Sequence, residues 1–301
     1  MRLILVLGTA TLLSIFPFFF VSLEGYRRHV PDEIYAFGHV GFFGLLTLLL
    51  MIAPQLRRIR YPVRAAAVLL FILFIGGCIE LIQGQIGRSA GLRDLWQNML
   101  GAAAAVALTA PTRLLRLVLI GVAGAALVAE LFNPTLTLVD RGIARSQFPV
   151  ISDFSTPLEG RRWSSGTLDT SITRTGGRSL RVTLHSGRLY TGTTLRRSFG
   201  DWSDYETAEL AIYVPDEAAI TVTISIRDRE HFARGGAYAD RFNRNVTLQQ
   251  GWNDIRIPID DIRNAPRDRT LDVSDLTELA IFASRPEQTR EIHLDALRLT
   301  R

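Results

Sequence analysis

Two different hydrophobic patterns divide the chain. Long apolar runs occupy roughly residues 3–23, 37–53, 65–83, 95–110 and 114–132. Each run is close to the ~20 residues that a helix needs to cross the hydrocarbon core of a bilayer, although the fourth is short and rich in alanine. Residues 1–133 are therefore predicted to form an all-α transmembrane bundle of about five helices.

After residue 133 the hydrophobic period changes to two. "SLRVTL" alternates apolar and polar residues, and "ITVTISI" places Ile220, Val222, Ile224 and Ile226 on one side of a strand. Further strands are predicted in "ELAIYV", "WNDIRIPI", "ELAIFAS" and "EIHLDALRL". Many short strands without helical segments between them predict an all-β sandwich over 150–301, joined to the helices by a linker at 134–149.

The basic residues are all arginine, and their excess lies in the apolar part. Residues 1–133 hold 11 Arg and 6 acidic residues, and the remainder holds 23 of each. The polar part is formally neutral, which argues against nucleic acid as a partner.

The arginines also predict the orientation in the membrane. If the N-terminus is cytoplasmic, seven of the eleven arginines of residues 1–133 lie on the cytoplasmic side, and four of these seven belong to "RRIRYPVR". Five spans then place the C-terminal domain outside a bacterial cytoplasmic membrane. The first run is expected to be a retained helix, since "FPFFF" occupies the place of a signal-peptide cleavage site.

Polar residues gather where the third apolar run ends and the fourth begins. Glu80 and Gln83 share one helix face, and Asp94 and Asn98 share a face of the next helix. The turn between them carries Arg88, and His39, at the start of the second run, is predicted at the same membrane surface. Because ionisable groups inside a membrane are costly, this cluster is a candidate functional site. The structural alternatives are a Glu80–Arg88 ion pair, a capping box of Asp94 with Gln97, and interhelical hydrogen bonds from Gln83 and Asn98.

The stretch "GGCIELIQGQIGRSAGLRDLWQNMLGAAAA" resembles the VanZ-like membrane proteins, over about residues 24–110. The family pattern is a Glu-x-x-Gln helix end, a Gly-Arg-Ser turn and an Asp-x-x-x-Asn-x-x-Gly helix start. It corresponds here to Glu80, Gln83, Gly87, Arg88, Ser89, Asp94, Asn98 and Gly101. An acid that the family often carries four residues before the His is replaced by Tyr35. The resemblance implies a polytopic envelope protein from a family linked to low-level glycopeptide resistance.

The run "GWNDIRIPIDDIRNAPRDRTLDVSDLTELAIF", followed by "IHLDALRL", resembles the end of a jelly-roll carbohydrate-binding module of the galactose-binding-like type. This resemblance covers about 150–301 and implies a glycan-binding jelly roll. It also implies a possible structural calcium between the opening and last strands, with Asp153 and Asp295 as its carboxylate ligands.

Sugar recognition needs flat aromatic faces and planar polar groups, and "RDREHFARGGAYADRFNRN" is their densest supply. Gly235 and Gly236 imply a flexible loop or a tight turn inside this stretch, and loops on rigid sandwiches carry binding functions. The alternative is that the two aromatic rings pack beneath the loop while Arg241 pairs with Asp240. Tyr190 and Trp202 are secondary candidates, and Trp163 and Trp252 are expected in the core. The candidates are His231, Tyr238, Asp240, Arg241, Phe242 and Asn243.

Three functions remain open at this stage. The first hypothesis is an envelope protein that presents a glycan-binding sandwich outside the membrane, with membrane lipid and an envelope polysaccharide or other glycan as partners. The second is an enzyme or transporter for a lipid-linked precursor, with Glu80 as base and Arg88 holding a phosphate; the missing acid at Tyr35 weakens it. The third is a sandwich that contacts another protein. Cys78, the only cysteine, excludes an intramolecular disulfide.

Overall fold

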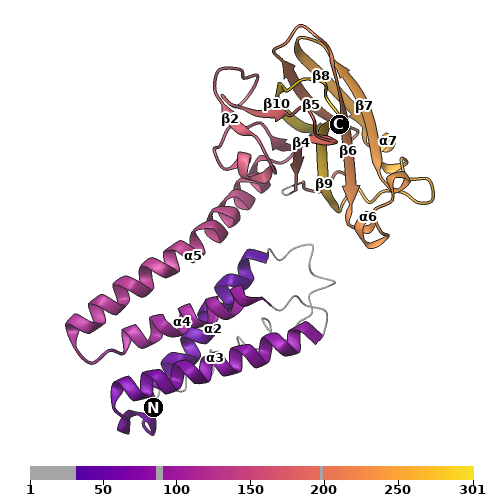
Figure 1. Ribbon diagram of the computed structural model, residues 1–301. Coiled ribbons are helices and arrows are strands. Elements are labelled where there is room, and N and C mark those ends of the chain that lie inside the picture. Colours follow the sequence, from indigo (N-terminus) through magenta and orange to yellow (C-terminus); the bar gives the residue numbers. More distant parts are fainter. Residues whose placement is uncertain (1–31, 86–90, 197–198) are drawn as a thin grey trace. The chain divides into compact units, whose positions relative to one another are not determined.

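The computed structural model describes residues 32–85, 91–196 and 199–301, and the chain divides into two compact units, Met1–Leu138 and Val139–Arg301. A helical N-terminal region is followed by a β-sandwich, as predicted (Figure 1). The apolar run predicted as a helix at 3–23 lies outside the described residues.

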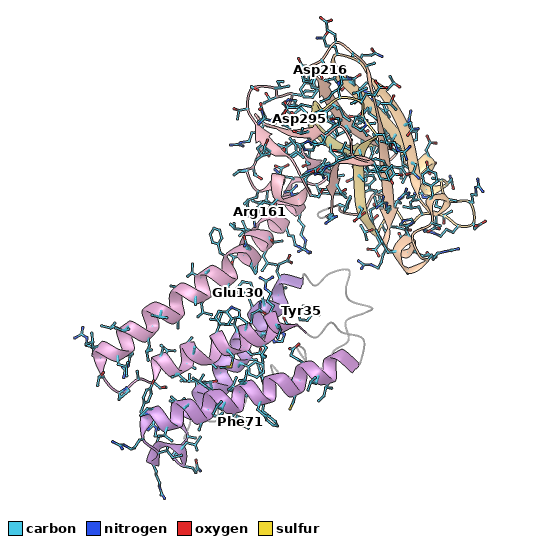
Figure 2. The ribbon with its side chains drawn as sticks, viewed as in Figure 1. Tyr35, Phe71, Glu130, Arg161, Asp216 and Asp295 are labelled. Carbon is cyan, nitrogen blue, oxygen red and sulfur yellow. The ribbon has the colours of Figure 1, made fainter. Side chains whose placement is uncertain are left out.

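Long apolar helices build the described part of the N-terminal unit. A small core packs between the first three of them, and it includes Phe43, Met51 and Ile72. Away from this core α3 exposes apolar side chains such as Leu70 and Phe71, the latter labelled in Figure 2. A helix that is apolar all round is typical of a membrane span. The helices are α2 (Asp32–Ile52), α3 (Tyr61–Gln85), α4 (Leu92–Leu108) and α5 (Arg113–Gln147), with the short η2 (Leu56–Arg58) after α2.

Among the described residues, three helices are long and apolar enough to cross a membrane. They are Glu33–Ile52, Tyr61–Ile82 and Arg113–Gln147. The fourth predicted span, α4, is not among them: it has 17 residues and buries the polar Gln97 and Asn98. The prediction of about five spans is thus supported for three helices by length and composition only.

Helices α2 and α4 approach each other closely through glycine. A Cβ added to Gly101 would lie 2.2 Å from the Val40 carbonyl oxygen, and one added to Gly44 would lie 3.3 Å from the Gly101 oxygen. Small residues let apolar helices pack backbone against backbone in this way. The close crossing brings His39 of α2 next to Asn98 of α4.

The segment predicted as a linker, 134–149, is largely helical. Helix α5 continues past Pro134 to Gln147, and its last turns belong to the C-terminal unit, where Asp140 and Ala144 are buried. The apolar run ends near Asn133, but the helix continues to Gln147. Beyond Asn133 only single positions of the helix, such as Asp140 and Ala144, are buried, so the sequence there lacks a continuous apolar run.

Two antiparallel sheets form the C-terminal unit. A six-stranded sheet has the order β2-β3-β10-β5-β8, with β1 paired to β10, and a four-stranded sheet has the order β4-β9-β6-β7 (Figure 1). The strands are β1 (Val150–Ser152), β2 (Thr167–Asp169), β3 (Ser179–Leu184), β4 (Tyr190–Leu195), β5 (Thr207–Val214), β6 (Ile220–Asp228), β7 (Phe242–Leu248), β8 (Gly251–Pro258), β9 (Leu276–Ser284) and β10 (Arg290–Thr300). The short helices are η3 (Glu159–Arg162), α6 (Arg229–Ala233), η4 (Tyr238–Asp240) and α7 (Ile259–Arg263).

One hydrophobic core fills the space between the two sheets. The alternation in "ITVTISI" is confirmed, because Val222, Ile224 and Ile226 are all buried in this core. All six predicted strand segments form strands. The strands β4 ("YTGTTL") and β7 ("FNRNVTL") were not predicted, since Thr191 and Thr193 of β4 and Arg244 of β7 take positions where an alternating strand would carry apolar residues.

Candidate functional site

The segment predicted as a flexible glycan-binding loop is built from regular elements. Strand β6 runs to Asp228, α6 and η4 follow, and β7 begins at Phe242. His231 is 2% exposed and Phe242 is 5% exposed, so both belong to the interior. The prediction that these two side chains contact a glycan is therefore wrong.

An ion-pair network holds this segment in place. Arg269 bonds Asp240 through Nε–Oδ1 at 2.7 Å and bonds Asp228 through Nη2–Oδ1 at 2.8 Å. Burial raises the pKa of Asp228, but hydrogen bonds from Arg269 and from the Asp272 and His231 amides outweigh it and lower that pKa overall. The hydrogen bond from Arg269 lowers the pKa of Asp240. Asp240 is thus an ionised anchor of the segment, and not the partner of Arg241 that the sequence suggested.

Tyr238 and Arg241 are the predicted residues that reach the surface. Tyr238 is 70% exposed, and the Arg241 guanidinium carbon lies 5.1 Å from the centre of its ring. Asn243 is half-buried, and its Nδ2 donates to the Tyr238 carbonyl at 3.4 Å. An aromatic ring stacked on a guanidinium offers both a flat apolar surface and planar donors.

Strand pairing extends this surface across the four-stranded sheet. Ile226 faces the core and pairs with Phe242, so the neighbouring Arg227 and Arg241 share the outer side. By the same alternation Ser225 lies opposite Asn243 on that side. We call this surface the outer face of the four-stranded sheet. Its members are Tyr190, Gly192 and Thr194 of β4, Glu278, Ala280 and Phe282 of β9, Thr223, Ser225 and Arg227 of β6, Asn243 and Asn245 of β7, and the adjacent Tyr238 and Arg241.

In addition to the Tyr238–Arg241 stack, the face carries a pair of aromatic rings. Tyr190 is 63% exposed and packs edge-to-face on Phe282, with ring centres 5.5 Å apart. Tyr190 was a secondary glycan candidate, and its exposure agrees with that role. Trp202, the other secondary candidate, is completely buried and donates its Nε1 to the Phe199 carbonyl, so that prediction is wrong.

Several polar atoms of this face are buried but hydrogen-bonded to none of the described residues. They are Ser225 Oγ, Arg227 Nε, Arg241 Nε and Asn243 Oδ1. These atoms form a polar layer just beneath the exposed side chains of the face, where ordered water commonly pairs such atoms. Sequence reasoning missed Ser225 and Arg227, because their place on the face follows only from the register of β6 and β7.

The charges on the face influence one another across strands. Burial lowers the pKa of the Arg241 guanidinium and nearby Arg227 lowers it further, whereas Tyr238, Tyr190 and Glu278 act in the opposite direction. Arg227 is paired with Glu278, with Nη1 and Oε2 2.6 Å apart. Tyr190 of β4 and Arg241 beside β7 therefore belong to one connected surface.

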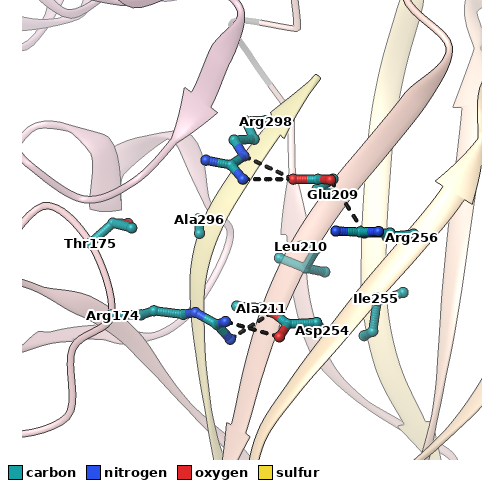
Figure 3. Close-up of a pocket in the computed structure, with 10 residues that line it drawn as sticks. All are labelled: Arg174, Thr175, Glu209, Leu210, Ala211, Asp254, Ile255, Arg256, Ala296 and Arg298. Carbon is teal, nitrogen blue, oxygen red and sulfur yellow. Dashed lines mark hydrogen bonds and ion pairs between the residues drawn. The ribbon is translucent and has the colours of Figure 1, made fainter. Parts of the chain in front are cut away.

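A small cavity lies over the six-stranded sheet, with a volume of about 170 Å³ (Figure 3). Its charges pair with one another: Glu209 binds Arg256 at 3.3 Å and Arg298 at 2.8 Å, and Arg174 binds Asp254 at 2.6 Å. Ligand pockets commonly measure ~300–1,000 Å³. Its small volume and mutually satisfied charges make this cavity a weaker ligand site than the outer face of the four-stranded sheet. Trp252, predicted in the core, is half-buried in this region and lies beneath the Arg174 guanidinium.

The carboxylates predicted to hold calcium have other partners. Asp295, completely buried within the sandwich (Figure 2), accepts from the Arg174 amide at 2.8 Å and from the Thr175 hydroxyl at 2.7 Å. Asp153 accepts from the Ser155 amide at 3.0 Å. Calcium requires oxygen ligands, whereas N–H and O–H donors face Asp295. These residues do not fit the calcium site, and Asp295 instead holds the 174–175 loop against β10.

The polar cluster of the helical unit draws residues from three helices. His39 Nδ1 lies 2.8 Å from Asn98 Oδ1, and its Nε2 lies 3.9 Å from Asp94 Oδ2. Glu80 Oε2 accepts from the Gly91 amide at 3.0 Å. The predicted convergence of His39, Glu80, Asp94 and Asn98 is thus seen in the structure.

The structural alternatives for this cluster have different outcomes. The N-cap of α4 is Gly91 and Asp94 lies inside the first turn, so the predicted capping box is absent there. Gln97 instead donates to Glu130 of α5 at 2.9 Å. The interhelical hydrogen bond predicted from Asn98 is present. Arg88 and the side chain of Gln83 lie outside the described residues, so their predicted roles stay predictions.

Comparison with known proteins bears on the C-terminal unit. Residues 155–301 match the family model described as Carbohydrate binding domain 30. None of the curated proteins compared with the chain matches it. The family match does not extend to the helical region, so the resemblance of residues 24–110 to VanZ-like proteins stays a prediction.

Solved structures of low identity also match this part of the chain. A family 11 carbohydrate-binding module from Clostridium thermocellum, in complex with a β-1,3-1,4-mixed-linked tetrasaccharide, is 18% identical, with a TM-score of 0.39, covering 50% of this chain and 94% of the module. A family 30 module of a cellulosomal cellulase of the same organism is 19% identical, with a TM-score of 0.33, covering 45% of this chain and 82% of the module. Residues 155–301 thus match the family model described as Carbohydrate binding domain 30 and form a β-sandwich of two antiparallel sheets.

Proposed function

We propose that this protein is an integral membrane protein of the bacterial cell envelope that binds a glycan with the outer face of its four-stranded sheet. The observation that carries the proposal is that two exposed aromatic groups, Tyr190 and Tyr238, lie on a face whose other side chains are mostly polar. Tyr190 and Tyr238 would cover the C–H surfaces of sugar rings. Arg227, Arg241 and Asn243 would bond their hydroxyl groups.

The composition of the face supports a glycan over a protein partner. The buried centre of a protein interface is usually apolar. Here the polar Ser225, Arg227 and Asn243 lie between the Tyr190–Phe282 pair and the Tyr238–Arg241 stack. A flat aromatic surface interrupted by planar donors and acceptors fits a sugar chain.

The test is binding by the full chain in detergent micelles to a panel of soluble polysaccharides, including mixed-linked β-glucan and bacterial envelope polysaccharides. Affinity electrophoresis identifies a ligand and calorimetry gives its affinity. Arg241→Ala should weaken binding roughly 10- to 30-fold, the size expected for an interface hot spot of about 1.5–2 kcal/mol. Arg256→Ala is the matched control, because Arg256 lies on the other sheet with its side chain 76% exposed.

Binding that is equal in wild type, Arg241→Ala and Arg256→Ala would place the glycan elsewhere on the domain. A folded wild-type protein that binds none of the polysaccharides would contradict the proposal and favour a protein partner.

The membrane part of the proposal rests on three apolar helices and on the arginine distribution. The expected orientation has a cytoplasmic N-terminus and the sandwich on the periplasmic or outer side. Single cysteines introduced at exposed Ser186 and Arg58, in a Cys78→Ser background, test it with a membrane-impermeant thiol reagent. Labelling of the Ser186 position alone in intact cells or spheroplasts is expected; labelling of the Arg58 position alone would reverse the topology.

The proposed alternative, an enzyme or transporter for a lipid-linked precursor, is favoured by one observation. His39, Glu80 and Asp94 converge from three helices although they are distant in sequence. Its test is a cellular resistance phenotype in Glu80→Gln: an unchanged phenotype with normal protein levels argues against chemistry at this cluster.

A further inference from the structure

One group of potential metal ligands lies in the helical unit, whereas the proposed glycan face belongs to the other unit. The ligand atoms of His39, Glu80 and Asp94 all lie within 4.8 Å of one another. The residues come from α2, α3 and α4, and His39 and Glu80 are each 7% exposed. An imidazole and two carboxylates gathered in a largely apolar interior are a suitable ligand set for a cation.

Asn98 fixes the orientation of the imidazole. Its Oδ1 lies 2.8 Å from His39 Nδ1, so with the oxygen as acceptor the Nδ1 atom carries the proton. The lone pair of Nε2 then faces Asp94 Oδ2 at 3.9 Å. That distance is too long for a hydrogen bond, and two acceptors facing each other favour a cation between them. Metal-binding histidines are commonly oriented by such a bond to their other nitrogen.

Asn98 is completely buried, and its Nδ2 is hydrogen-bonded to none of the described residues. This N–H donor does not bind a cation itself, but it suits a water molecule or an anion at the open coordination position of a bound ion. The carboxylate of Glu80 is held at the start of α4 by the Gly91 amide, which keeps it beside Asp94.

We propose that His39, Glu80 and Asp94 bind a divalent transition-metal ion, such as Zn²⁺ or Mn²⁺, with Asn98 as the residue that orients His39. The nitrogen ligand favours these ions over Mg²⁺ and Ca²⁺, which prefer oxygen. Two carboxylate ligands would balance the charge of a divalent ion. The side chain of Asp94 is 35% exposed, which gives the ion access. Three protein ligands leave a coordination position open for water or an anionic group.

The experiment uses the full chain in detergent micelles, with the affinity tag removed and the protein stripped with chelator. Calorimetry with Zn²⁺ or Mn²⁺ should show one site per chain, with much weaker binding of Mg²⁺ and Ca²⁺. Co²⁺ serves as a spectroscopic probe, since its visible absorption reports the number and geometry of its ligands. Glu80→Gln and Asp94→Asn should each lower Zn²⁺ affinity by about 100-fold or more, and Asn98→Ala by about 10- to 100-fold.

The matched control is Glu130→Gln. Glu130 is also a largely buried carboxylate of the helical unit, but it binds Arg93 at 2.9 Å and Gln97 at 2.9 Å outside the cluster. Zn²⁺ affinity should be unchanged in this variant. If Glu80→Gln fails to fold, Asp94→Asn and the change in the Co²⁺ absorption spectrum of His39→Gln carry the test. Failure of stripped wild-type protein to bind Zn²⁺ or Mn²⁺, or equal affinity in wild type and Asp94→Asn, would overturn the proposal. Neither result depends on glycan binding by the sandwich.

Discussion

Arg162 binds both carboxylate oxygens of Asp140, with Nε 3.1 and 3.0 Å from them and Nη2 2.8 Å from Oδ1. The Arg162 side chain has no exposed surface, and its Nη1 also donates to the Ile151 carbonyl at 2.7 Å. The pair fixes the last turns of α5 to the opening of the sandwich within the C-terminal unit.

Removal of one partner of this pair should strongly destabilise the C-terminal unit. We expect Asp140→Ala to lower the free energy of unfolding by about 3–5 kcal/mol, because it removes the two-oxygen partner of a buried guanidinium and leaves only the Ile151 carbonyl and the more distant Glu159, 3.8 Å away. Chemical denaturation of the full chain in micelles, followed by tryptophan fluorescence, measures the change. Arg256→Ala breaks an exposed pair and should cost only about 0–1 kcal/mol. Equal effects of the two substitutions would contradict the structural role of Arg162.

His293 should make the sandwich less stable in mild acid. Burial lowers the pKa of its imidazole, and Ser179 Oγ lies 3.1 Å from its Nδ1. Below an unfolded-state pKa of about 6.5 the unfolded chain binds a proton that the native protein does not, so stability falls as pH decreases from about 7. The slope reaches at most about 1.4 kcal/mol per pH unit for this group.

Denaturation midpoints between about pH 5 and 7 test the role of His293. His293→Gln should flatten the pH dependence, whereas His185→Gln, at an exposed position, should leave it as in the wild type. An unchanged slope in His293→Gln would assign the pH dependence to other groups.

A methyl group at residue 101 should separate α2 from α4. In Gly101→Ala the new Cβ would lie 2.2 Å from the Val40 oxygen, so the helix pair must shift at an expected cost of about 1–3 kcal/mol. Thermal unfolding in detergent micelles measures the loss. Gly121→Ala is the control, because nothing lies within 4 Å of its added Cβ, and it should be neutral or slightly stabilising. If the metal site is present, Gly101→Ala should weaken it as well by moving His39.

The aromatic ring of Tyr190, and not its hydroxyl, should carry its part in glycan binding. Tyr190→Phe keeps the edge-to-face contact with Phe282 and should retain affinity within about twofold, whereas Tyr190→Ala should lose roughly tenfold or more. Phe232→Ala, at a 50% exposed aromatic outside the face, should bind as the wild type does. Calorimetry with the polysaccharide identified in the binding screen compares the variants. A large loss in Tyr190→Phe would show that the hydroxyl group contacts the sugar.

The sequence by itself determined the two-part organisation of this protein. Apolar runs and period-two alternation depend on neighbouring residues in one element, so helices such as α3 and strands such as β6 are readable without a fold. The motif spacing likewise predicted that Glu80, Asp94 and Asn98 would lie together, since i, i+3 and i, i+4 positions share a helix face.

Only the tertiary structure decided which residues form the outer face of the four-stranded sheet, the proposed glycan site. Whether His231, Phe242 and Trp202 are buried or exposed depends on the packing of one sheet on the other, and local sequence carries no record of that packing. The place of Ser225 beside Asn243 depends on the register between β6 and β7, because a shift of one residue would turn every side chain to the opposite side. The contact of His39 with Asn98 depends on the close crossing at Gly101, which joins residues 59 positions apart.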